Sequence, residues 1–191
     1  MSDAALNAGP IVVGIDPDTP GFLRPLAQLL LWINKAMVLL GMLALLAASL
    51  VLTYSVVSRY VVQASTDWQD EAAVFCLVGA TFLCAAFVQG LRGHVGIEAV
   101  ATILPDAVNR WRVVAVDLLC FAFCTFFSWK SWTLFHEAWV EHQTTSSSWA
   151  PPLAIPYGLM ALGMSLLSLQ LLVQFGARVN GLRKHTAGVP V

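Results

Sequence analysis

The chain has 191 residues, of which 58% are hydrophobic and only 11% are charged. This composition excludes a water-soluble enzyme, because an ordinary soluble domain carries roughly 25% charged residues and could not bury so much apolar surface. The formal net charge of −1 excludes the basic surface that nucleic-acid binding requires. Membrane lipid is therefore the first predicted partner.

Residues 1–25 are predicted to form a flexible cytoplasmic tail. The first 20 residues are acidic, contain Gly and Pro, and lack the basic start and short apolar stretch of a cleaved signal peptide. Pro20 and Gly21 mark the point where ordered structure is expected to begin. A membrane domain is predicted over residues 26–178, followed by a second cytoplasmic tail at 179–191.

Four long apolar blocks occupy about residues 33–57, 72–91, 113–135 and 153–175. Each is close to the ~20 residues that a helix needs to cross a ~30 Å hydrocarbon layer. Strands of a membrane barrel would be about half as long and would alternate in polarity. The sequence therefore predicts an all-α membrane protein with four transmembrane helices.

A shorter apolar segment at residues 95–104 is interrupted by Glu98 and cannot span a membrane. It is suited to lying along the membrane surface. We expect a short cytoplasmic surface helix between transmembrane helices two and three, with Pro105 opening the next helical segment.

Basic residues indicate which side of the membrane each helix end faces, because cytoplasmic flanks retain positive charge. Arg59 and Lys130 alone fall on the side where Asp67, Asp70, Glu71, Glu137 and Glu141 collect. The other eight of the ten Lys and Arg residues lie on the side of the two termini, at Arg24, Lys35, Arg92, Arg110, Arg112, Arg178, Arg183 and Lys184. Both termini are therefore predicted to be cytoplasmic, in a multi-pass membrane protein.

The most enzyme-like string runs from His136 through Glu137 to His142. A zinc helix needs two histidines four residues apart on one face, but position 140 is Val and these histidines are six apart. We therefore predict a solvated external loop, and no metal or other cofactor.

The four cysteines lie inside the apolar blocks, at Cys76, Cys84, Cys120 and Cys124. Buried thiols that act as small apolar residues are the simplest interpretation. The alternative function is a standalone four-helix protein such as a thiol/quinone oxidoreductase. That chemistry requires exposed cysteine pairs in external loops, where none occurs in this sequence.

Charged side chains are nearly absent from the predicted spans. Asp117 lies about one turn inside helix three, where it is expected to reach the cytoplasmic interface or to pair with Arg110 or Arg112. Helices two and four carry no central charge, which is unlike a transporter that works alone. The sequence therefore predicts a scaffold or accessory subunit rather than an enzyme.

Helices two and four also carry residues suited to close helix packing. Small residues permit close contact, and glutamine side chains favour protein over hydrocarbon. The small residues are Gly79, Ala80, Ala85, Ala86, Gly158, Ala161, Gly163 and Ser165, and the glutamines are Gln89, Gln170 and Gln174.

The order of several short motifs resembles the small membrane subunit, of DctQ type, of tripartite ATP-independent periplasmic (TRAP) transporters. These motifs are Arg59-Tyr60, Trp68-x-Asp70-Glu71, Gly79-Ala80, Arg92-Gly93-His94, Leu104-Pro105 and the Pro-rich stretch from Ala150 to Tyr157. The resemblance covers about residues 33–175. It implies a large DctM-type membrane subunit that carries the substrate and sodium sites and works by an elevator motion. It also implies a DctP-type periplasmic binding protein that delivers an organic acid.

Two groups of charged residues are the candidate interface sites. Trp68, Asp70 and Glu71 are predicted to anchor the periplasmic start of helix two, since acidic groups are favoured at a helix N-terminus, and Arg59 is their expected charge partner. A second group is predicted to hold the surface segment against anionic headgroups or against the large subunit. It consists of Arg92, His94, Arg110 and Arg112.

The predicted topology can be tested by labelling single cysteines with an impermeant reagent, after the native thiols have been replaced. A cysteine at position 146 should react from outside intact cells, whereas one at position 94 should react only after permeabilisation. The reverse pattern would contradict cytoplasmic termini.

Overall fold

The structure is a computed structural model that describes residues 19–63, 67–91 and 106–186. Its long helices are α1 (Arg24–Val57), α2 (Asp67–Gly90), α4 (Asp106–Val140) and α5 (Ala154–Thr186). Each contains a stretch long and apolar enough to cross a membrane. The prediction of an all-α protein with four transmembrane helices is confirmed. The predicted surface helix at 95–104 lies outside the described residues.

Local sequence explains several helix boundaries. A short 3-10 turn, η2 (Gly21–Leu23), precedes α1, and Pro25 lies in the first turn of α1, where its missing N–H removes no helical hydrogen bond. A π-helical turn, η3 (Ser58–Val62), continues α1, and Gln63 follows it in the left-handed conformation with φ 55°. At its far end α5 continues past Arg178, the last residue predicted for the membrane domain.

The helices form an open row rather than a closed bundle. Helix α2 packs along α1 and α5, and α5 packs along α4, so the order across the row is α1, α2, α5, α4. The start of α1 also contacts α5, where Ala27 and Leu30 pack with Val173. Inner helices are correspondingly more buried: 28% of the spanning window of α2 and 39% of that of α5 lie inside the protein, against 11% for both α1 and α4. The two edge helices therefore present most of their surface to the surroundings.

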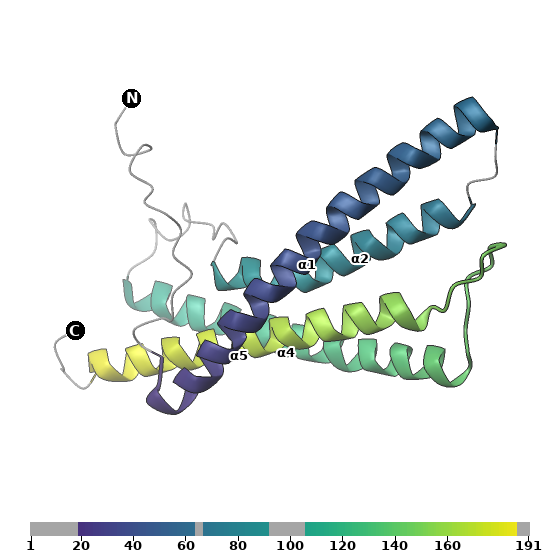
Figure 1. Cartoon of the computed structure of the whole chain (residues 1–191). Helices are drawn as coiled ribbons and strands as arrows, with labels where there is room; N and C mark the ends of the chain where they lie inside the picture. The colour runs from purple at the N-terminus through teal and green to yellow at the C-terminus, as the bar shows by residue number, and fades with distance from the viewer. Residues whose placement is uncertain (1–18, 64–66, 92–105, 187–191) are drawn as a thin grey trace, which may run out of the picture.

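Different parts of the helices meet at the two ends of the row (Figure 1). The start of α1, the end of α2, the start of α4 and the end of α5 lie together at what we call the terminal end. The end of η3, the start of α2 and the α4–α5 loop lie at the opposite, hairpin end. The α4–α5 loop is held by two backbone hydrogen bonds, from Leu153 N to Gln143 O at 2.9 Å and from Thr145 N to Pro151 O at 3.1 Å.

Small residues mediate the contacts between neighbouring helices. A Cβ atom on Gly163 of α5 would lie only 2.4 Å from the main-chain oxygen of Phe82 in α2. Ala80 and Ala86 of α2 and Ala161 of α5 are also buried, with at most 3% exposure. The small residues predicted to permit close helix contact at these positions are thus used within the molecule.

Replacing Gly163 by Ala should destabilise the protein by about 1–3 kcal/mol, because the added methyl group meets backbone that cannot move without separating α2 from α5. Thermal unfolding in detergent measures this. Gly79→Ala is the matched control, since the methyl group there would meet only the end of the Leu159 side chain, at 3.1 Å. Equal effects of the two substitutions would contradict the packing argument.

Candidate functional site

A polar stripe on α5 connects the helices near the terminal end. Gln170, Gln174 and Arg178 are spaced four residues apart, which places them on one face of the helix. Their partners are Asn34 of α1, Gln89 of α2 and Asp117 of α4, respectively. Each of the other three helices therefore contributes one polar side chain to α5.

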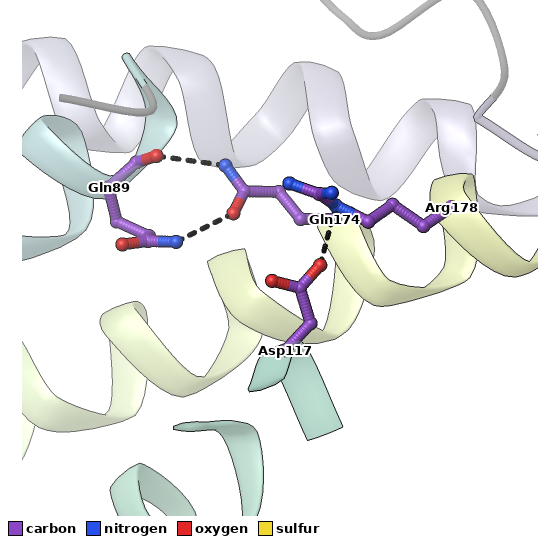
Figure 2. Close-up of polar contacts among 4 residues, drawn as sticks. All are labelled: Gln89, Asp117, Gln174 and Arg178. Carbon is purple, nitrogen blue, oxygen red and sulfur yellow. Dashed lines mark hydrogen bonds and ion pairs between the residues drawn. The ribbon is translucent and has the colours of Figure 1, made fainter. Parts of the chain in front are cut away.

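The amide pairs make direct hydrogen bonds inside the protein. Gln89 Nε2 donates to Gln174 Oε1 at 2.8 Å, and Gln174 Nε2 donates to the main-chain oxygen of Gln89 at 2.9 Å (Figure 2). Asn34 Nδ2 donates to Gln170 Oε1 at 3.1 Å, and Asn34 is only 2% exposed. The prediction that these three glutamines face protein is confirmed.

Asp117 forms an ion pair across the α4–α5 interface. Arg178 Nε lies 2.5 Å from Asp117 Oδ2, and the side chains are 30% and 15% exposed (Figure 2). This ion pair joins Asp117 to a residue of the neighbouring helix, which the sequence did not indicate. The expected pairing of Asp117 with Arg110 or Arg112 stays a prediction.

A second polar contact between α4 and α5 lies nearer to the hairpin end. Ser165 Oγ is 2.9 Å from Ser128 Oγ, accepts a hydrogen bond from Trp132 Nε1 at 3.0 Å, and donates to the Ala161 main-chain oxygen at 2.7 Å. Ser165, predicted as a small packing residue, is thus also a hydrogen-bonding centre.

The residues predicted to anchor α2 lie together at the hairpin end. Arg59 pairs with Asp70 at 3.6 Å, with both side chains 59% exposed. The ring of Trp68 lies edge-on to that of Trp149, with centroids 6.4 Å apart, so α2 meets the α4–α5 loop here. Glu71 lines a pocket beside the same loop. An exposed ion pair contributes about 0–1 kcal/mol, too little to fix α1 against α2 by itself.

The second predicted group is only partly described. Arg92 and His94 lie outside the described residues, while Arg110 and Arg112 belong to the first two turns of α4, with Arg112 half-buried. Its role at the membrane surface stays a prediction.

The described residues show no group of three or more His, Cys, Asp or Glu side chains that could hold a metal ion. The four cysteines are free thiols within the long helices. What the polar stripe can do chemically is to bind helices to one another, since most of its amide and charged groups bond across helix interfaces. Asn34 Oδ1 is buried without a hydrogen-bond partner among the described residues.

Sequence reasoning missed two members of the stripe. Asn34 lies beside apolar residues near the start of α1, and Arg178 served only as a marker of topology. The four-residue spacing of Gln170, Gln174 and Arg178 was the available signal, because it is the spacing of a single helix face.

The open row of four long apolar helices defines a multi-pass membrane protein whose polar groups join its own helices. Residues 48–181 match the family model of the DctQ component of tripartite ATP-independent periplasmic transporters. The match covers more than half of the chain, so the chain belongs to this family and is a small component of a TRAP transporter rather than an enzyme. A comparison with curated proteins gave no match.

Replacing Asp117 by Asn should lower stability by about 1–3 kcal/mol, because Arg178 would remain without its charge partner. The double substitution Asp117→Asn with Arg178→Gln should recover part of this loss. Arg59→Gln, which breaks the exposed pair, is the control and should cost less than about 1 kcal/mol. Unfolding in detergent measures these three variants and Arg178→Gln alone, and strictly additive effects of the two single substitutions would exclude coupling between Asp117 and Arg178.

Proposed function

We propose that this chain is the scaffold subunit of a TRAP transporter that imports organic acids with a sodium gradient. It would lie beside a large subunit that carries the substrate and sodium sites, and a periplasmic binding protein would deliver the substrate. The observation that carries the proposal is the open row of helices, whose edge helices α1 and α4 are each only 11% buried over their spanning windows.

The placement of the polar groups favours a scaffold role for this chain over a role in binding and moving the substrate. Substrate and ion sites in secondary transporters use intramembrane charges and interrupted helices near the middle of the membrane. In the described part of this chain, α2, α4 and α5 are continuous over their spans. The intramembrane ion pair between Asp117 and Arg178 joins α4 to α5.

A wide, flat subunit suits an elevator transporter for a mechanical reason. One part of the large subunit must stay fixed in the bilayer while the substrate-carrying part crosses it. Aromatic side chains at the membrane boundary resist such displacement. All seven tryptophans of this chain are exposed, at 42% or more, and can therefore contact lipid or a partner.

We further propose that the protein lies in the bacterial inner membrane with its terminal end in the cytoplasm. The terminal end carries Arg24, Arg110 and Arg112, whereas Asp70, Glu137 and Glu141 lie toward the hairpin end, together with Arg59. This distribution follows the rule that cytoplasmic flanks retain positive charge.

Reconstitution in proteoliposomes tests the scaffold role. The large subunit and the binding protein should take up substrate under a sodium gradient when this chain is present, and should lose most uptake when it is omitted. The purified chain should show no saturable substrate binding by calorimetry. Full uptake without the chain would contradict the scaffold role, and substrate binding to the chain alone would place the transport site here.

A further inference from the structure

A pocket of about 370 Å³ lies at the hairpin end, between the start of α2, the α4–α5 loop and the start of α5. Its apolar walls are formed by Val74, Phe75, Leu153 and Pro156. Asp70 and Glu71 also line it. The interior of the pocket is therefore almost wholly apolar, and two acidic residues contribute to its wall.

Asp70 and Glu71 differ in exposure to solvent and in whether their carboxylates have a partner. Asp70 is 59% exposed and already paired with Arg59. Glu71 Oε2 is shielded from solvent and has no hydrogen-bond partner among the described residues. A buried polar atom without a partner costs about 1–3 kcal/mol, and a charged one costs more. Within the described structure Glu71 therefore lacks a hydrogen-bond donor for its Oε2 atom, and a partner protein could supply one.

We propose that Glu71 accepts a hydrogen bond from a lysine or arginine side chain of the large membrane subunit, whose aliphatic stem fills the pocket. This inference rests on the proposed function, which supplies that partner. Lysine and arginine combine an apolar stem with a charged tip, which matches apolar walls around one carboxylate. A bare divalent cation would require six or more oxygen ligands, whereas these walls are mainly hydrocarbon.

The position of the pocket favours a partner within the membrane over a soluble one. Val74 and Phe75 belong to the spanning stretch Trp68–Gly90, and Val74 is 53% exposed. The pair formed by Trp68 and Trp149 lies at the start of that stretch, as expected for aromatic residues at the membrane boundary. A side chain that packs against Val74 therefore contacts the spanning stretch of α2, which favours a partner that itself lies in the membrane.

Glu71→Gln separates this interface role from a structural one, because it keeps the size of the side chain but removes its charge. The affinity of the chain for the large subunit in detergent should fall by about tenfold or more. The melting temperature of the isolated chain should stay the same or rise, since an unpaired buried charge is removed. Glu137→Gln, at an exposed residue of α4 outside the pocket, should change neither quantity.

Unchanged affinity in Glu71→Gln would overturn the inference, and so would a loss of affinity together with a lower melting temperature. If the wild-type chain itself fails to bind the large subunit, the proposed function is wrong, and the pocket inference falls with it.

A photo-cross-linking residue in place of Val74 identifies the occupant directly. In membranes that contain the complete transporter, the expected adduct joins this chain to the large subunit and is lost in the Glu71→Gln background. An adduct with the binding protein alone, or with lipid alone, would overturn the assignment of the partner.

Discussion

The polar stripe of α5 is the constraint on which the rest of the arrangement depends. An amide or charged group that faces hydrocarbon without a partner costs several kcal/mol, so the three side chains of the stripe must all face protein together. Because they share one helix face, rotating α5 by a single residue would turn all of them away from their partners. Gln170, Gln174 and Arg178 thereby fix the rotation of α5 relative to three other helices at once.

Packing makes these hydrogen bonds possible. Side-chain amides reach across only when two helices approach closely, and Gly163 allows the backbone of α5 to lie against that of Phe82 in α2. The same pair of helices then carries the double hydrogen bond between Gln89 and Gln174. Steric fit and polar pairing therefore specify the same neighbour for α5, and each would be weakened by the loss of the other.

The number of spans could be read from the sequence, because a helix in lipid must be long and apolar whatever its neighbours are. Gln89 and Gln174 could also be assigned to the interior, since hydrocarbon excludes them. Their partners could not be assigned, because hydropathy does not encode the lateral order of helices. For this reason Asp117 was matched only to arginines nearby in sequence, and its partner Arg178 on α5 was not found. Glu71 was recognised as an anchor residue, but its pocket depends on the α4–α5 loop, whose contact with α2 no local pattern reveals.

The use of polar groups differs between the interior of this subunit and its hairpin end. A transport site must keep polar groups available, because ions and substrate exchange there as the cycle proceeds. In the interior of this chain the stripe residues bind one another and hold the helices in a single arrangement. At the hairpin end, by contrast, Glu71 Oε2 remains without a partner in the described structure. A fold whose interior polar groups mainly join its own helices, and which has among its described residues an acidic group without a partner at its edge, is suited to assembly with a larger protein, and less suited to moving a solute by itself.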